Sequence, residues 1–273
     1  MRGHLVLGLT LCLMACSRPS GSDLKVVDVE HTTIERQSIG NCWLYAHASW
    51  VESLHKTATG QDFDLSESYL TYWHWFSQIE DATTEISTGG SFRTANNLIR
   101  KFGMMSENDF VFSDTLNEMS YRQADALRRI NQSLASGVLS SPEARANRQL
   151  VRQELDSAWG LTPEVTRQLD LVFGLDGARN FVNNQADNGG TSVLKASEFS
   201  VRYALRDAES GIVTSVDSPL TKAMLDWRSE GIWGFDRDQQ IRMQRALHAR
   251  QPVLISWAVD FNALENSPAS EVR

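Results

Sequence analysis

The chain contains the stretch Gln37-Ser-Ile-Gly-Asn-Cys42-Trp-Leu-Tyr-Ala46, in which a turn leads at once into a helical pattern. Glycine and asparagine in succession are typical of a turn followed by a helix cap. From Cys42 to about Ala58, apolar and aromatic residues recur every three or four positions, as on one face of an α-helix. The spacing therefore predicts a helix whose first turn carries Cys42.

A cysteine in this position has two interpretations. A thiol is nucleophilic as its thiolate, and the unpaired amide groups and the dipole of a helix N-terminus favour that form. In this interpretation the Cys42 backbone amide and the Gln37 side-chain amide stabilise an oxyanion, while Trp43 shields one side from water. In the alternative, Cys42 is a small buried hydrophobe, the usual role of a lone cysteine. The turn before Cys42 favours the reactive interpretation, because a core cysteine does not need one.

Two more helices are predicted after this stretch. One begins at Leu65-Ser66-Glu67 and continues through apolar positions to Phe76. The other follows Gly89-Gly90 and ends at Gly103, a typical helix stop. Residues 237–249 also have amphipathic helical spacing and lead into an apolar run, 251–261, which predicts a buried strand.

These segments resemble, in order, the motifs of the papain-like cysteine peptidases, especially the branch that contains bleomycin hydrolase. Residues 37–46 resemble the nucleophile segment and residues 65–70 the helix start Leu-Ser-Glu-Gln. Residues 89–110 resemble the Gly-Gly segment with its following helix and aromatic turn, and residues 237–261 resemble the entry into the right-hand lobe. The resemblance covers most of 34–112 and 237–261.

The resemblance implies an α+β, papain-like two-lobe fold over residues 24–273, with a cleft between the lobes. The left lobe would be helical, and the β-rich right lobe would be incomplete at the C-terminus. Residues from about 113 to 185 differ from papain and are rich in Arg, Gln, Glu, Ala and Leu at helical spacing, with breaks at 140–142 and 160–163. They predict a helical insertion.

The resemblance also implies the site and its reaction. Cys42 would be the nucleophile and Gln37 the oxyanion donor. Gly89 and Gly90 would pair their backbone with an extended peptide, with Trp43 as a further substrate-binding residue. The reaction would be hydrolysis of a peptide or protein substrate through an acyl-enzyme. It requires no cofactor, and the spacing of His and Cys suggests no metal site.

The glutamine departs from the family pattern by one position. The family places it six residues before the cysteine, whereas Gln37 lies five before Cys42 and the sixth position holds Arg36. Either the loop is one residue shorter or Arg36 has a different role. We expect Gln37 to be the donor.

The catalytic base is the larger departure. The family's histidine follows the strand that we place at 253–261, with an asparagine later still, but residues 262–273 contain no histidine. The histidines of the chain are His4, His31, His47, His55, His74 and His248. His47 and His55 lie too far along the Cys42 helix to reach its first turn. Three explanations remain: a truncated reading of a longer peptidase, which we favour; an inactive relative that binds peptides; or a histidine from a second chain.

The N-terminus reads as a targeting signal. A basic start and an apolar run within residues 1–15 are typical of a secretory signal too short to span a bilayer. The run ends in Leu13-Met14-Ala15-Cys16, which resembles the lipobox of bacterial lipoproteins. That resemblance implies cleavage before Cys16, lipidation of Cys16 and a polar tether over 16–23. Ser17 favours the outer membrane. The alternatives are a plain signal peptide of a secreted protein and a short membrane anchor.

Composition bounds the remaining classes. The 273 residues include 34 Asp and Glu against 26 Lys and Arg, an acidic balance that argues against bulk binding to nucleic acid. Cys12 and Cys16 lie in the signal region and leave Cys42 alone in the body, which excludes a disulfide framework there. The oligomeric state stays open.

Overall fold

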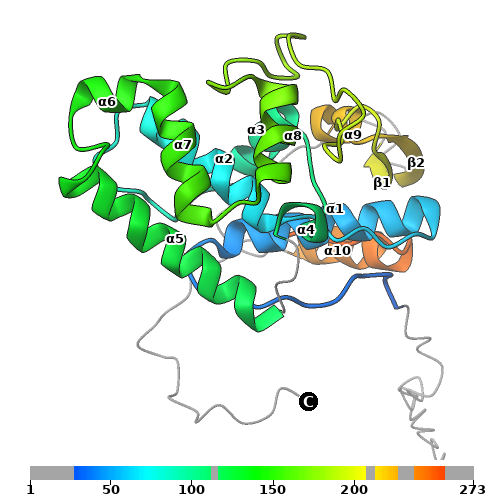
Figure 1. The fold of residues 1–273 in the computed structure, drawn as a ribbon. Helices are drawn as coiled ribbons and strands as arrows, with labels where there is room; N and C mark the ends of the chain where they lie inside the picture. The colour runs from blue at the N-terminus through cyan, green and yellow to red at the C-terminus, as the bar shows by residue number, and fades with distance from the viewer. Residues whose placement is uncertain (1–27, 112–115, 207–212, 227–236, 256–273) are drawn as a thin grey trace, which may run out of the picture.

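The computed structural model describes residues 28–111, 116–206, 213–226 and 237–255 (Figure 1). The signal, the lipobox with Cys16 and the tether, all predicted over 1–23, lie outside the described residues. The elements in chain order are α1 Cys42–Thr59, α2 Glu67–Glu80, α3 Phe92–Phe102, α4 Glu107–Phe110, α5 Leu116–Ser136, α6 Pro142–Ala146, α7 Arg148–Trp159, α8 Pro163–Phe173, β1 Ser200–Arg206, β2 Val213–Pro219, α9 Leu220–Asp226 and α10 Arg237–His248.

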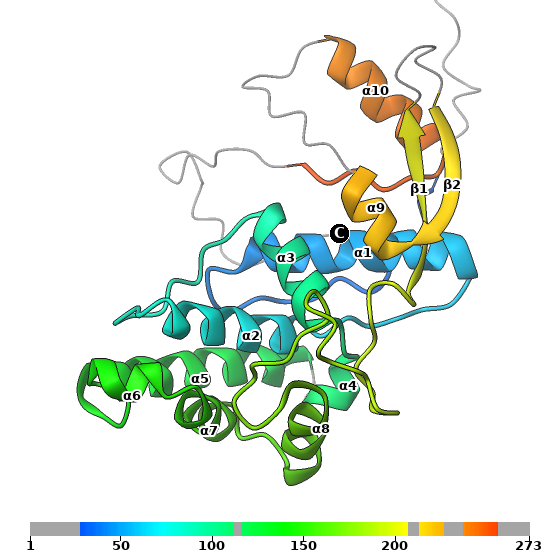
Figure 2. The same ribbon diagram turned by 90° about the horizontal axis from the view of Figure 1, so that it is seen from above.

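Helix α1 lies between two groups of elements. Figure 2 shows α2 and α4 to α8 on one side of α1, and the β1–β2 hairpin with α9 and α10 on the other. The two strands pair antiparallel, with Tyr203 opposite Val216. The described residues thus form a mixed helical and antiparallel structure, which confirms the α+β class.

Capping residues mark the ends of the helices that were predicted from the sequence. The Ser66 side chain accepts a hydrogen bond from the Tyr69 amide at the start of α2, as capping serines do. Ser91 and Thr94 form a reciprocal capping box at the start of α3. Gly103 ends α3 with a φ of 73°, a left-handed value that favours glycine. The helices predicted after Cys42, Leu65 and Gly90 are therefore confirmed.

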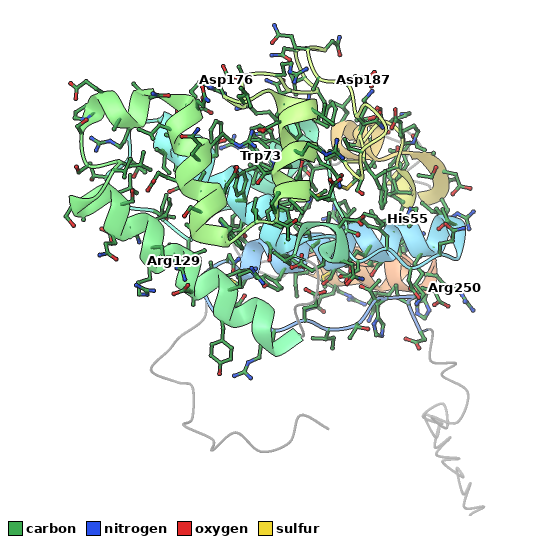
Figure 3. All side chains as sticks on the ribbon, in the orientation of Figure 1. His55, Trp73, Arg129, Asp176, Asp187 and Arg250 are labelled. Carbon is green, nitrogen blue, oxygen red and sulfur yellow. The ribbon has the colours of Figure 1, made fainter. Side chains whose placement is uncertain are left out.

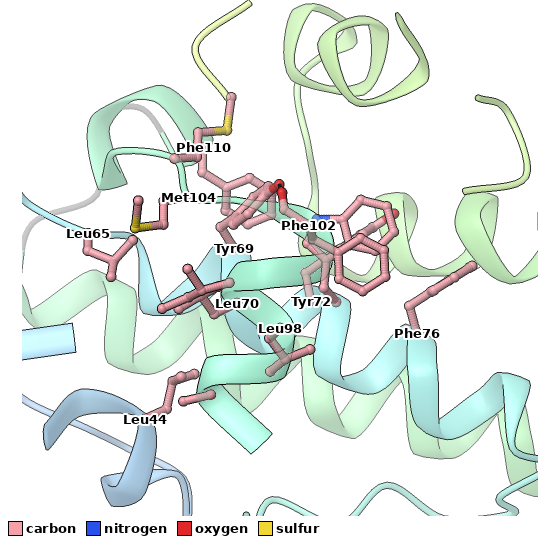
Figure 4. Close-up of a cluster of buried hydrophobic side chains, with 14 of the residues drawn as sticks. Leu44, Leu65, Tyr69, Leu70, Tyr72, Phe76, Leu98, Phe102, Met104 and Phe110 are labelled. Atoms are coloured by element: carbon pink, nitrogen blue, oxygen red, sulfur yellow. Dashed lines mark hydrogen bonds between the residues drawn. The ribbon is translucent and has the colours of Figure 1, made fainter. Parts of the chain in front are cut away.

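Aromatic side chains fill the core between α2, α3 and α8. The Trp73 ring stacks on the Phe102 ring with centroids 4.1 Å apart, and Phe173 packs against both. The Tyr69 hydroxyl donates to the Phe102 carbonyl at 2.5 Å, so its polar end is satisfied at the C-terminal turn of α3. Figure 4 shows this cluster of apolar side chains around α2 and α3.

The helices predicted as an insertion share this core. The predicted breaks at 140–142 and 160–163 separate α5 from α6 and α7 from α8. Ala126, Ile130 and Leu134 of α5 are buried in the same cluster as the residues of α1 to α3. The buried Arg152 of α7 donates to the hydroxyl of Tyr72 at 2.7 Å. Within the described part of the chain, these helices are therefore an integral part of the helical body.

The strands differ from the prediction. The hairpin over 200–219 was not predicted, although Val201, Tyr203 and Leu205 alternate with more polar residues as strand residues do. The predicted strand at 251–261 is wrong over its described part, because residues 251–255 form no strand. Pro252 lacks the amide hydrogen that a paired strand requires at that position. Residues 256–261 lie outside the described residues.

Candidate active site

Cys42 is the first residue of α1 and is exposed. The alternative of a buried core cysteine is therefore wrong. The residue before it, Asn41, occupies the cap position of α1, yet its side chain makes no capping hydrogen bond. The Asn41 carbonyl accepts from the Leu44 amide at 2.9 Å and from the Tyr45 amide at 3.4 Å, while the amides of Cys42 and Trp43 have no partner among the described residues. The thiol thus lies beside the positive end of a helix whose cap side chain is turned elsewhere, an arrangement that favours negative charge.

The structure brings the Gly89–Gly90 loop against the Cys42 turn. Trp43 Nε1 donates to the Thr88 carbonyl at 2.9 Å. A Cβ on Gly90 would lie 2.4 Å from two atoms of the Trp43 ring, so the Gly90 backbone rests on that ring. A Cβ on Gly40 would lie 2.6 Å from Thr88 Oγ1, so the two loops also meet there. Two motifs about fifty residues apart in the sequence are therefore in contact in the fold.

Side chains of α2 and α5 form hydrogen bonds with the residues just before the two glycines. Gln78 of α2 is bonded twice to Ser87, accepting from its amide at 2.8 Å and donating to its carbonyl at 2.9 Å. Asn131 of α5 accepts from the Ile86 amide at 2.9 Å. Gly89 and Gly90 themselves are exposed. The loop is therefore anchored through Ile86 and Ser87, while the backbone of Gly89 and Gly90 is exposed to solvent.

The Trp43 side chain packs under the Gly89–Gly90 loop. Its ring is half-buried between the Gly90 backbone and the ring of His74, whose centroid lies 5.2 Å away in an edge-on arrangement. Its indole nitrogen is committed to Thr88. Trp43 thus supports the loop that would bind a peptide, and direct contact with a substrate stays a prediction.

Gln37 lies in the extended segment before the bend at 39–40. Its side chain is exposed, and no hydrogen bond among the described residues fixes it. Its assignment as oxyanion donor stays a prediction, and so does the alternative role of Arg36.

No described histidine makes a hydrogen bond to Cys42. His47 is fully buried between the rings of Phe92 and Trp50, and neither ring nitrogen has a partner among the described residues. Burial lowers the pKa of His47 to about 3 and that of the half-buried His74 to about 4, so both are neutral near pH 7. His55 stacks on Phe199 and donates to the Ser200 carbonyl at 2.7 Å, which ties α1 to β1 (Figure 3).

A cluster of buried carboxyl groups lies under the segment that leads to Cys42. The carboxyl of Glu35 in this segment lies close to the carboxyls of the buried Glu67 and the exposed Asp64. Burial and the proximity of the other acids raise the pKa of both Glu35 and Glu67. Glu52 of α1 accepts from the Leu65 amide at 2.7 Å, and burial raises its pKa to about 7.

The sequence analysis missed this cluster, because its members come from separate elements. The local signal is weak: Glu52 follows the buried Ala48 by four residues on α1, whereas Glu67 stands among buried serines at the start of α2. Thr32 donates a hydrogen bond to the Glu52 carboxyl, so this contact holds segment 28–38 on the helical body ahead of the turn before Cys42.

The described residues contain no cluster that could hold a metal ion, and their pocket lies away from Cys42. Among the described residues, no three His, Cys, Asp or Glu side chains are arranged to hold a metal ion. A pocket opens between α5 and the end of α7, lined by Tyr121, Arg122, Asp125, Arg129, Ala158, Trp159 and Gly160. Arg129 marks its position in Figure 3. None of the predicted site residues lines it.

Comparison with known proteins leaves the family open. Neither the protein-family models nor the curated proteins contain a match to this chain. In the ranges that the structure describes, no helix combines the length and the apolar character needed to cross a bilayer.

Proposed function

We propose that the chain is a cysteine-type peptidase of papain-like fold, with Cys42 as its nucleophile. The observation that carries the proposal is the exposed thiol at the start of α1, whose chain neighbours Gly40 and Trp43 pack against the anchored 88–90 loop. A helix N-terminus supplies amide groups and a dipole that stabilise a thiolate. The exposed backbone of the loop offers hydrogen-bonding groups to an extended peptide.

The reaction proceeds in two steps. The Cys42 sulfur attacks the carbonyl carbon of the scissile bond, so that a C–S bond forms and the C–N bond breaks, and the amine leaves with the proton that the thiol gives up. Water then attacks the thioester, which releases the carboxylate and restores the thiol. The Cys42 backbone amide and the Gln37 side chain are the oxyanion donors of this proposal.

A non-catalytic peptide-binding protein on the same fold is the second candidate. The observation in its favour is that no described histidine forms a hydrogen bond with the Cys42 thiol, while acyl transfer needs a general base within reach. This candidate uses the same loop for binding and leaves Cys42 without a catalytic role.

Hydrolysis and binding of a peptide library by the wild-type protein and by Cys42→Ala separate the two candidates. A peptidase loses hydrolysis with Cys42→Ala and keeps peptide binding. Binding without hydrolysis in both proteins supports the second candidate and contradicts the first.

The oxyanion donor is tested by a matched pair of variants. Gln37→Ala is expected to lower kcat by roughly a hundredfold, as the loss of one oxyanion donor does in other enzymes. Arg36→Ala, one residue away, is expected to leave kcat nearly unchanged. The reverse result would assign the role to Arg36.

The proposal places this protein at the bacterial envelope through a lipid on Cys16. Its support is the lipobox-like end of the apolar signal. Growth with a labelled fatty acid should label the wild-type protein and leave Cys16→Ser unlabelled. Labelling that persists in Cys16→Ser contradicts this part of the proposal.

A further inference from the structure

A buried polar network connects the residue before Cys42 to helix α5. Asn41 is 2% exposed, and its Nδ2 donates to Gln123 Oε1 at 3.0 Å and to Thr71 Oγ1 at 3.3 Å. Gln123 is fully buried, and its Nε2 donates to the Tyr45 hydroxyl at 2.9 Å and to Ser68 Oγ at 3.3 Å. One side chain of α5 therefore contacts the first turn of α1 at two points, Asn41 and Tyr45.

Gln123 occupies an unusual place on its helix. Gln123, Ala126 and Ile130 follow one another at helical spacing on the buried face of α5. A polar amide on an apolar face costs stability unless its hydrogen bonds are made. Here its oxygen accepts one hydrogen bond and its nitrogen donates two, so Gln123 is satisfied only while Asn41, Tyr45 and Ser68 keep their positions.

The network holds the Asn41 side chain away from the helix end. Asparagine in this position normally turns its oxygen to the amide groups of the first turn. Asn41 makes no such bond, and its φ of −108° and ψ of 30° differ from the extended values of a capping residue. Its Oδ1 is buried without a partner among the described residues. A capping oxygen would place partial negative charge beside the thiol and occupy the amides that favour a thiolate.

We infer that Gln123 is a positioning residue for Cys42, an inference that rests on the proposed function. By holding Asn41 inward, Gln123 keeps the amide groups of Cys42 and Trp43 open to the Cys42 sulfur and to an oxyanion. Helix α5, which the sequence suggests is an insertion, thereby takes part in building the site.

The first test replaces Gln123 by an apolar side chain of similar size. Gln123→Met removes its hydrogen bonds and frees Asn41 to cap α1. Alkylation of Cys42 by iodoacetamide, followed by peptide mass spectrometry, should slow by roughly twofold to fivefold, the typical range of a helix-terminus effect on a charge. Ser133→Ala is the matched control, because it removes the hydrogen bond from α5 to Glu154 without touching the network. Its alkylation rate should equal that of the wild type.

A second variant separates positioning from a purely structural role. In Asn41→Ser the shorter side chain does not reach Gln123, and its hydroxyl can cap α1. Alkylation should slow as in Gln123→Met, while the thermal midpoint holds better than in Gln123→Met. Rates that follow the thermal midpoints of the three variants point to a structural role and overturn the inference.

The outcomes distinguish this inference from the proposed function. If wild-type Cys42 reacts no faster than free cysteine, the proposed function fails and the inference fails with it. If wild-type Cys42 reacts fast and both Gln123→Met and Asn41→Ser react equally fast, the inference alone is overturned.

Discussion

Gly90 illustrates at the scale of one residue how the candidate site is assembled. Its backbone lies so close to the Trp43 ring that any side chain would overlap it. Gly89 has no such neighbour, since a Cβ there would meet only Ser87 Oγ at 3.6 Å, an ordinary contact. The two glycines therefore have different roles, although the sequence motif treats them alike.

This difference gives a matched prediction. Gly90→Ala should displace the loop from Trp43 and lower the free energy of unfolding by about 1–3 kcal/mol, the usual cost of overpacking. It should also weaken peptide binding. Gly89→Ala should leave stability nearly unchanged. Chemical denaturation of both variants checks the prediction, and an equal effect of the two substitutions would contradict it.

Cys42 and Asn41 differ in how far their positions could be predicted from the sequence. The exposed position of Cys42 at a helix start follows from a local pattern, the Gly-Asn turn and the apolar spacing after it. The inward turn of Asn41 does not, because Gln123 lies 82 residues away in the chain. No local pattern relates the two.

Among the elements, the long helices are predicted best, because their ends carry local signals. Ser66, Ser91 and Gly103 mark boundaries of α2 and α3 that agree with the expected ones. The hairpin 200–219 was not predicted, since short strands depend on packing against α1 and α9 more than on propensity. The buried carboxyl cluster was missed for the same reason, because tertiary packing alone brings Glu35 and Glu67 together.

The elements α2, α7 and α8 are joined by one buried cation. Arg152 is 1% exposed and donates to the Tyr72 hydroxyl, to the Gly174 carbonyl at 3.1 Å and to Asp170 Oδ1 at 3.1 Å. A buried guanidinium with this many partners fixes the relative positions of the three helices.

Removing this cation should therefore destabilise the helical body. Arg152→Met is expected to lower the free energy of unfolding by about 3 kcal/mol, because its buried partners lose their donor. Arg128→Met, which removes an exposed ion pair with Asp125 of α5, should leave stability essentially unchanged. Urea unfolding followed by circular dichroism measures both. A loss in Arg128→Met as large as that in Arg152→Met would refute the role of burial.

At the scale of the whole molecule, the buried titratable groups predict a narrow pH range of maximal stability. The folded state raises the pKa of Glu52 to about 7, so it binds the proton more tightly than the unfolded chain does. The stabilisation that Glu52 contributes is therefore fully present below about pH 4.5 and is lost as the pH rises through about 7. Glu35 and Glu67 act in the same direction.

The buried histidine acts in the opposite direction. The folded state lowers the pKa of His47 to about 3, so the unfolded chain binds the proton more tightly. Its contribution is present above about pH 6.5 and is lost as the pH falls toward about 3. The thermal midpoint should therefore be highest in mildly acidic solution.

Thermal unfolding across this pH range tests the carboxyl contribution with one variant. Glu52→Gln keeps an oxygen for the Leu65 amide and removes the titration. Its thermal midpoint should fall less than that of the wild type between about pH 5 and about pH 8. Parallel curves for the two proteins would show that Glu52 does not hold its proton as its burial implies.

The most direct test of Cys42 as a nucleophile is its rate of alkylation by iodoacetamide at about pH 6, where an ordinary thiol is almost wholly protonated. Peptide mass spectrometry resolves Cys42 from Cys12 and Cys16, and Cys42→Ser provides the blank. If Cys42 is the nucleophile, it should react roughly ten times faster than free cysteine under the same conditions. A rate equal to that of free cysteine would contradict the proposed function.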